Sequence, residues 1–206
     1  MARRGDHSLE QIQEMILDTA RNIVNEQGIH ALTVRKIALD VGYTVGSVYM
    51  VFANMQELVM HIKASTLEEI TAQLHNVSAE LSMEQKILVM AENYHQFATE
   101  NFNRWSIIFN TDSPVKDEIP SWYREKVESL FVPVEAVFKQ LNPNSSFEQQ
   151  AQAARTLLCG VHGVCLLALN GNLGQAGIAS SAIAVRLLVE SFVQGWKQQL
   201  AKLPNT

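Results

Sequence analysis

The chain has 206 residues, of which 47% are apolar and 18% are charged. A chain of this length and composition buries a sizeable core as one or two domains, which excludes intrinsic disorder and low-complexity polymers. Lys and Arg total 16 against 21 Asp and Glu, for a formal net charge of -5. This balance excludes a polybasic binder of nucleic acids or membranes, so any nucleic-acid site must be local.

Several features favour a reduced, cytoplasmic and water-soluble protein. The amino end, MARRGDHSLEQ, meets polar and charged residues within ten positions and lacks the apolar core of a signal peptide. No apolar run approaches the roughly 18 residues that a membrane span requires. On one helix, Cys159 and Cys165 would differ by about 9 Å along the axis, beyond the reach of a disulfide. We therefore expect a cytoplasmic protein with no membrane partner.

Apolar residues at three- and four-residue spacing, with little period-two alternation, predict an all-α fold of about nine helices. The first helix is expected over residues 9–27, from the capping-box pair Ser8 and Gln11 to the stop at Gly28. Two short helices that begin after Thr33 and Thr44 are expected next, followed by a long helix from Asn54 to about His75. Further helices are expected over residues 82–100, 102–110, 121–140, 147–169 and 179–200. Pro114 and Pro120 bracket an acidic connector, and Pro133 is expected to kink the helix that contains it.

Residues 33–52 show a short helix, a glycine-containing turn and a second short helix, the proportions of a helix-turn-helix. Thr33 is expected to cap the first helix, which ends at Gly42, and Thr44 caps the second. Four apolar side chains are expected to lock the two helices together: Ile37, Ala38, Val48 and Phe52. The exposed residues of the second helix are small or carry hydroxyls, which leaves its amino end free to enter a major groove. The alternative is an ordinary helical hairpin whose hydroxyls only cap.

This segment resembles the DNA-binding domain of the TetR-type transcriptional repressors. The match rests on Leu32, Thr33, Ile37, Ala38, Val41 and Gly42, then Ser47, Tyr49 and Phe52, then Glu57 and Leu58, and it covers residues 9–60. The segments HQFATENFNRWSIIFN and GVHGVCLLAL also resemble a regulatory domain named after a Trp-His-Gly signature, with Val161 at the position of the tryptophan. The resemblance implies a helix-turn-helix domain over residues 1–54 and a helical regulatory and dimerisation domain over residues 55–206.

The resemblance implies phosphate contacts around the two short helices. Backbone N–H groups beside the caps Thr33 and Thr44 could meet phosphates, and Tyr49 would donate its hydroxyl to one. Arg3 and Arg4 form a basic arm ahead of the first helix. Two departures from the family pattern remove possible phosphate partners: Val51 stands where a histidine is frequent, and Met55 where a lysine is frequent.

The resemblance also implies contacts with base edges. Arg35 could reach a guanine, Val45 could touch a thymine methyl, and Ser47 could donate or accept a hydrogen bond, with Gly46 between them in the same DNA-binding set. Residues 1–64 hold six basic and seven acidic side chains. We therefore predict few neutralised phosphates and a shallow dependence of DNA affinity on salt.

Nine of the 15 aromatic residues lie between positions 94 and 138, which suggests the wall of a ligand cavity. The candidate ligand-binding residues are Tyr94, Phe97, Phe102, Trp105, Phe109, Trp122, Tyr123 and His162. A plain aromatic core is the alternative for any one of them. The resemblance implies a small effector, apolar or aromatic, whose binding releases DNA.

No cofactor, metal or catalytic activity is expected. Cys159, His162 and Cys165 recur every third residue, but on a helix the outer two diverge, so a metal would need ligands from elsewhere. An enzyme is the alternative of a different class, but we find no activated-nucleophile motif or phosphate-binding glycine loop. A third possibility is a helical ligand-binding or interaction module that has lost DNA binding.

An inverted-repeat operator requires a two-fold dimer, and the two carboxyl-terminal helices offer the broadest surface for a homodimer. The candidate contacts are Leu157, Leu158, Val161, Leu188, Phe192 and Trp196. Burial within one chain explains many of them equally well.

Overall fold

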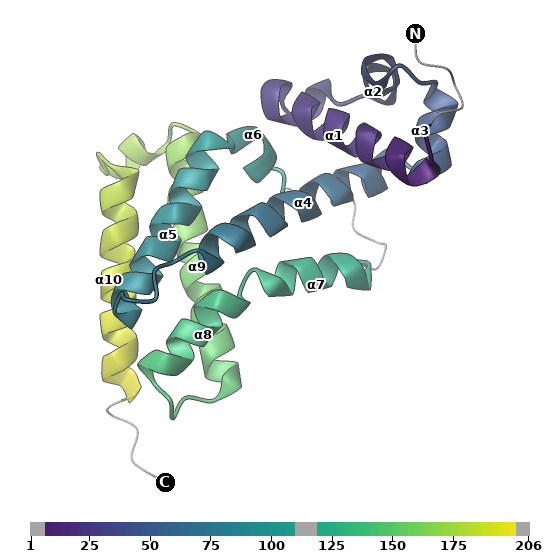
Figure 1. Cartoon of the computed structure of the whole chain (residues 1–206). Coiled ribbons are helices and arrows are strands. Elements are labelled where there is room, and N and C mark those ends of the chain that lie inside the picture. Colours follow the sequence, from purple (N-terminus) through teal and green to yellow (C-terminus); the bar gives the residue numbers. More distant parts are fainter. Residues whose placement is uncertain (1–6, 110–118, 201–206) are drawn as a thin grey trace. The chain divides into compact units, whose positions relative to one another are not determined.

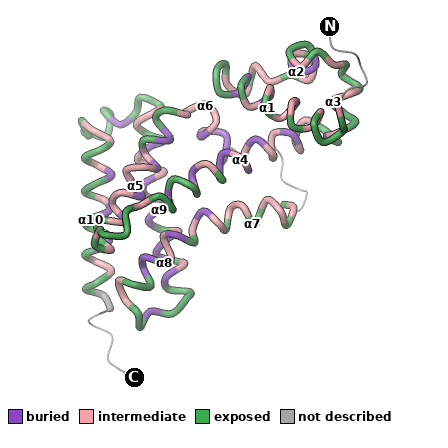
Figure 2. Tube along the Cα trace, in the orientation of Figure 1, coloured by how far each residue is buried: buried purple, intermediate pink, exposed green. Residues whose placement is uncertain are grey.

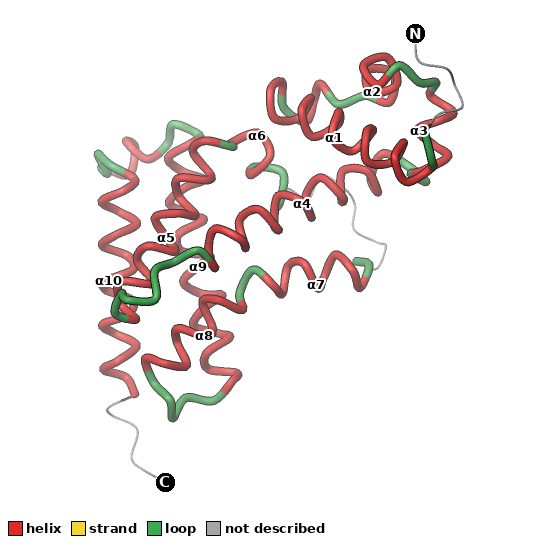
Figure 3. The backbone as a smooth tube through the Cα atoms, viewed as in Figure 1, coloured by secondary structure: helices red, strands yellow, loops and turns green. Residues whose placement is uncertain are grey.

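The computed structural model describes residues 7–109 and 119–200, without the side chains of residues 199 and 200. This part of the chain forms ten α-helices and two 3-10 turns and contains no strand (Figures 1 and 3), which confirms the predicted all-α class. The helices are α1 Leu9–Gln27, α2 Val34–Val41, α3 Val45–Val51, α4 Met55–His75, α5 Met83–Glu100, α6 Phe102–Trp105, α7 Ser121–Ser129, α8 Val132–Leu141, α9 Phe147–Leu169 and α10 Ser181–Leu200, and the 3-10 turns are η1 Ile29–Ala31 and η2 Leu173–Ala176.

The described residues divide into two compact units. Unit 1 comprises those of Met1–Thr66 and Asn101–Tyr123, and unit 2 those of Leu67–Glu100 and Arg124–Thr206. The division falls inside the helices α4 and α7, so each of these helices contributes residues to both units. The domain boundary expected after residue 54 stays a prediction.

Local hydrogen bonds set the start of several helices where the sequence predicted them. Ser8 and Gln11 form a reciprocal capping box at α1, with the Gln11 N–H donating to Ser8 Oγ at 3.2 Å. The same arrangement joins Ser146 and Gln149 at the start of α9. These side chains accept hydrogen bonds from backbone N–H groups that have no partner within the first turn, so they specify where the helix begins.

The core of unit 1 joins α1, α2, α3 and the first part of α4. Its buried side chains are Ile16, Ala20, Ile23, Val24, Ile37, Ala38, Val48, Phe52, Leu58, Ile62 and Ile107. Ile107 follows α6, and α6 itself packs against α1. The core therefore fixes α2 and α3 against the long helix α1.

Unit 2 is a bundle in which α5 packs against α8, α9 and α10, and α9 packs against α8 and α10. Figure 2 shows buried stretches along these helices. A methyl group built on Gly160 would lie 2.9 Å from Leu188 Cδ2. The missing side chain at Gly160 thus permits the close approach of α9 and α10.

Two helix predictions differ from the structure. The helix expected over residues 121–140 is two helices, because Pro133 lies in the first turn of α8 and has no N–H to continue the ladder of α7. The helix expected over residues 102–110 ends at Trp105. Trp105, Ile107 and Ile108 are all buried. Asn110 and Pro114 lie outside the described residues.

Within the described residues, α9 is the one helix whose length and composition would allow it to cross a membrane. No apolar run of that length was expected from the sequence. An 18-residue window of α9 has a mean hydropathy of 1.4. Because α9 packs against three other helices of unit 2, we interpret it as a core helix, since such helices meet the same criterion.

Candidate nucleic-acid interface

The helices α2 and α3 are held together by buried apolar side chains and a glycine turn. Ile37 and Ala38 of α2 and Val48 of α3 are buried, as is Phe52 directly after α3, which confirms their predicted place in the core. Gly42 adopts φ 78° and ψ 25°, a left-handed conformation that favours glycine. The N–H of Tyr43 then donates to the carbonyl of Ala38 at 2.9 Å and closes the end of α2.

Threonine hydroxyls cap both helices as predicted. Thr33 Oγ1 accepts from the Lys36 N–H at 3.2 Å, and Thr44 Oγ1 accepts from the Ser47 N–H at 3.2 Å. Thr44 Oγ1 also lies 2.9 Å from Ser47 Oγ. Each cap satisfies one N–H of its first turn, and the first turn of a helix holds further N–H groups that face outward.

The predicted DNA-binding residues lie together on the surface of unit 1. Six of the seven are exposed, and Ser47 is partly buried. The exposed six are Thr33, Arg35, Thr44, Val45, Gly46 and Tyr49. The Tyr49 side chain is 46% exposed, so it is not buried in the core of unit 1. The structure therefore brings these residues to one helix-turn-helix surface.

Met50 on α3 is exposed and was missed by the sequence analysis. It is 70% exposed, more than any of the apolar residues that the sequence analysis placed at the DNA. It lies one turn after Gly46, so a helical wheel of α3 would have placed both on the face opposite Val48.

This surface carries little charge. Residues 33–52 contain three ionisable groups of full charge at neutral pH: Arg35, Lys36 and Asp40. Lys36 Nζ lies 3.4 Å from Asp40 Oδ2, one helical turn away. Arg21 of α1 likewise pairs with Asp18. Arg35 is therefore the cation of α2 whose charge is not offset by a neighbour, and Arg3 and Arg4 lie outside the described residues.

The eight candidate ligand-binding residues belong to different units. Tyr94, Phe97 and His162 lie in unit 2, whereas Phe102, Trp105, Phe109, Trp122 and Tyr123 lie in unit 1. The Trp122 ring stacks on the His61 ring with centroids 4.6 Å apart, and His61 in turn packs edge-on to Phe52 at 5.5 Å. Trp122 thus contributes to packing beside the end of α3.

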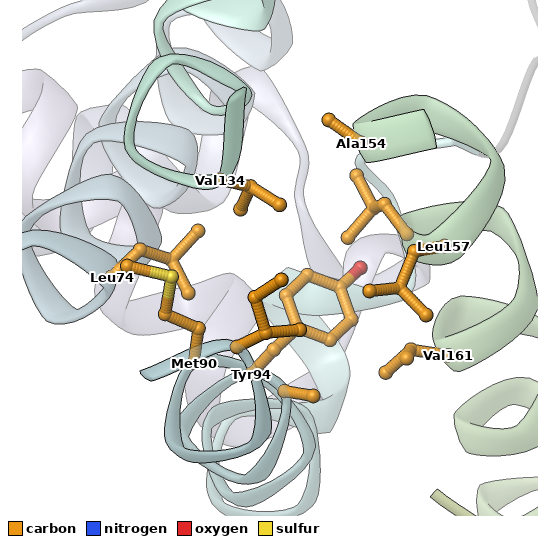
Figure 4. A pocket seen from close by; sticks show the side chains of 10 residues that line it. Leu74, Met90, Tyr94, Val134, Ala154, Leu157 and Val161 are labelled. Carbon is orange, nitrogen blue, oxygen red and sulfur yellow. The ribbon is translucent and has the colours of Figure 1, made fainter. Parts of the chain in front are cut away.

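Unit 2 contains a small apolar cavity of about 30 Å³. Its lining comes from α4, α5, α8 and α9: Leu74, Ile87, Met90, Ala91, Tyr94, Val134, Ala154, Leu157, Leu158 and Val161. Figure 4 shows the Tyr94 ring among these aliphatic side chains, with its hydroxyl toward α9. Of the eight candidate ligand residues, Tyr94 alone lines this cavity.

The Tyr94 hydroxyl is the polar group of the lining, and it lies 2.9 Å from His162 Nδ1. Burial lowers the pKa of His162, so its neutral form is favoured, and a neutral imidazole can accept or donate this bond. Two other polar side chains of α5 are engaged elsewhere: His95 Nε2 lies 2.8 Å from Ser181 Oγ, and Glu92 pairs with Arg186 at 2.5 Å.

The two carboxyl-terminal helices of the bundle keep apolar side chains on the outside. Leu166 and Leu167 of α9 and Ile183 and Leu187 of α10 are exposed, as is Cys159. Most of the predicted dimer contacts are buried or pack against other side chains within one chain. Leu157 and Val161 are buried, Leu188 packs on Gly160, and Phe192 and Trp196 pack edge-on to Phe138.

Cys159 and Cys165 do not converge on a common site. Cys159 is exposed, whereas Cys165 is fully buried, and its burial raises the pKa of the thiol to about 12. The described residues contain no group of three His, Cys, Asp or Glu side chains that could hold a metal ion.

Two family models match this chain in succession. Residues 16–62 match the model described as bacterial regulatory proteins, tetR family, and residues 87–192 match the one described as tetracyclin repressor-like, C-terminal domain. A curated relative, an uncharacterized HTH-type transcriptional regulator from Mycobacterium tuberculosis, is 25% identical over 159 residues, which make up 77% of this chain and 71% of the relative.

Solved structures share the fold. A protein with unknown function from Rhodococcus sp. RHA1 is 18% identical with a TM-score of 0.75, and the match covers 94% of this chain and 98% of that one. A tetR-family transcriptional regulator from Streptomyces coelicolor is 15% identical with a TM-score of 0.68, covering 96% of this chain and 92% of that one.

Proposed function

We propose, because this chain belongs to the tetR family of bacterial regulatory proteins, that it is a cytoplasmic repressor that binds an inverted-repeat operator as a homodimer and leaves it when a small effector binds. Family membership makes the chain a DNA-binding transcriptional regulator and not an enzyme. The observation that carries the proposal is the surface of α2 and α3, where Thr33, Arg35 and Tyr49 are exposed around an apolar recognition helix.

Repression is tested by transcription in vitro from a template on which a bound duplex sequence overlaps the promoter. We expect the protein to lower the yield of transcript. An increased yield would identify an activator instead.

The exposed apolar stripe of α9 supports the homodimer. Gly163 lies one turn after Cys159 and three residues before Leu166, so all three share this stripe. Apart from the adjoining backbone of α9, a methyl group built on Gly163 would meet no atom of the described residues within 4 Å. A larger side chain there is thus tolerated by the monomer, but it would separate two chains that meet at this face.

The dimer is tested by sedimentation of the wild type, Gly163→Leu and the matched control Gly174→Leu, at which an added side chain also meets open space. We expect the wild type and Gly174→Leu to be dimers and Gly163→Leu to be a monomer. A dimeric Gly163→Leu protein would remove this face from the proposed interface.

The cavity of unit 2 supports a small, neutral and largely apolar effector. None of its ten lining residues is charged, and the Tyr94 hydroxyl supplies its hydrogen-bonding group. A charged ligand would leave its charge unpaired in apolar surroundings, which is strongly unfavourable.

The small size of the cavity supplies a physical reason why effector binding is coupled to DNA binding. A volume of about 30 Å³ holds one or two water molecules, so a larger effector must push the lining apart and prefers an expanded state. The helix α4 places Leu58 and Ile62 in the core of unit 1 and Leu74 in the cavity lining of unit 2. We propose that α4 transmits the expansion, and that the effector weakens DNA binding by the same factor as DNA weakens effector binding.

The effector site is tested by release of a labelled duplex with neutral probes, 1-hexanol and benzyl alcohol, against the charged controls hexylamine and hexanoate. We expect release by the neutral probes from the wild type. Ala154→Leu fills the cavity, so it should bind DNA but resist release, and Tyr94→Phe should discriminate less between an alcohol and an alkane. Equal release from wild type and Ala154→Leu would exclude this cavity as the effector site.

A further inference from the structure

The outermost face of α3 is apolar. Successive residues of a helix are rotated by about 100°, so Gly46 and Met50 lie opposite the buried Val48. Met50 is 70% exposed, and Gly46 has no side chain to cover it. The thioether of Met50 therefore extends from the part of α3 that lies farthest from the core of unit 1.

The hydrogen-bonding capacity of α3 is small. The helix has no charged residue, and its polar side chains are Ser47 and Tyr49. Ser47 Oγ already lies 2.9 Å from Thr44 Oγ1. Tyr49 keeps an exposed hydroxyl for a phosphate, whereas Val45 and Met50 are the exposed side chains of α3 that offer base edges apolar contacts.

The major groove of DNA presents one apolar group on its base edges, the C5 methyl of thymine. The second helix of a helix-turn-helix lies in this groove, whereas the first crosses the backbone. The apolar side chains of Val45 and Met50 therefore match thymine methyl groups and offer no hydrogen-bond donor to the acceptor atoms of guanine. The exposed side chain of α2 suited to bidentate bonding with guanine is Arg35.

We propose that Met50, together with Val45, contacts thymine methyl groups and thereby specifies T·A pairs in each operator half-site. This inference rests on the proposed operator binding through α2 and α3. Methionine is unbranched and flexible, so one Met50 side chain can fit against the methyl groups of adjacent thymines. Met50 is thus a specificity-determining residue for T·A pairs.

The test replaces thymine by deoxyuridine, one position at a time, in a duplex that the wild-type protein enriches from a random library. This change removes the methyl group and keeps base pairing and the O4 acceptor. For each contacted thymine we expect the wild type to bind about three- to fourfold more weakly, the effect of exposing one methyl-sized apolar group. Met50→Ala should lose this discrimination at one or two positions of the half-site.

The matched control is Leu39→Ala, which truncates another exposed apolar side chain, 79% exposed, on α2. We expect it to keep the discrimination between thymine and deoxyuridine. Equal binding of both duplexes by the wild type, discrimination that survives in Met50→Ala, or its loss in Leu39→Ala would each overturn the assignment to Met50. If no duplex is bound at all, the proposed operator binding fails, and this inference fails with it.

Discussion

The dependence of DNA affinity on salt follows from the few cations at the interface. Each phosphate that a basic side chain neutralises releases condensed counterions, so the logarithm of affinity falls linearly with the logarithm of salt concentration. Lys36 lies 3.4 Å from Asp40 and adds no net charge, which leaves Arg35 on α2 and the arm residues Arg3 and Arg4. A dimer with these three cations in each chain would have a slope of about -5.

The expected losses of affinity at high salt distinguish the wild type from a variant without the arm arginines. Between 50 and 200 mM salt a slope of about -5 weakens binding roughly 1,000-fold. Removing the arm with Arg3→Ala and Arg4→Ala leaves Arg35, for a slope of about -2 and a loss of roughly 15-fold. Fluorescence anisotropy of a labelled duplex over this range of salt measures both slopes. A wild-type slope near -10 would refute the reasoning, because it would require phosphate contacts from cations that lie elsewhere.

Three further predictions concern the stability and reactivity of the two units. Because burial lowers the pKa of His162, the unfolded state binds a proton below about pH 6.5 that the folded state does not. The free energy of unfolding, measured by urea titration, should therefore fall as the pH drops below about 6.5, and it should fall less in His162→Gln. Gly42→Ala should lower that free energy by about 1–2 kcal/mol, because φ is 78°, and Gly42→Asn should cost less; equal losses would contradict this account. With its pKa near 12 and no exposed surface, Cys165 should resist iodoacetamide at pH 8 until denaturant is added, and labelling of the native protein would show that the site is open.

The helix boundaries were predictable wherever they depend on local hydrogen bonds. Ser8, Thr33 and Thr44 cap their helices as their positions in the sequence indicated, and Gly42 ends α2 in the left-handed conformation. Such interactions span three or four residues, so the sequence contains both partners side by side. The core positions Val48 and Phe52 were predictable for a similar reason, because helical spacing alone places them on one face.

The lining of the cavity was not predictable, because it depends on which helices meet. The cluster of aromatic residues suggested one wall, but Trp122 stacks on His61 in unit 1 while Tyr94 lines a mostly aliphatic cavity in unit 2. Aliphatic lining residues have the same periodicity as any core residue, so nothing in the sequence distinguishes Ala154 or Leu157 as a ligand contact. The outward face of α9 was not predictable for the same reason. Leu157 and Val161 could be dimer contacts or core residues by sequence, and the structure buries both, whereas Leu166 and Leu167 are exposed.

The measurement that tests the central claim most directly is selection of bound duplexes from a random library by the purified chain, at roughly physiological salt to suppress non-specific phosphate contacts. The account predicts enrichment of an inverted repeat whose half-sites lie about 34 Å or a multiple of that distance apart, as two recognition helices require. Tyr49→Phe should weaken binding to all enriched sequences alike, whereas Arg35→Ala should relax the preference at particular bases. Enrichment of no sequence, or of sequences without two-fold symmetry, would contradict the assignment of α2 and α3 as the operator-binding surface of a dimer.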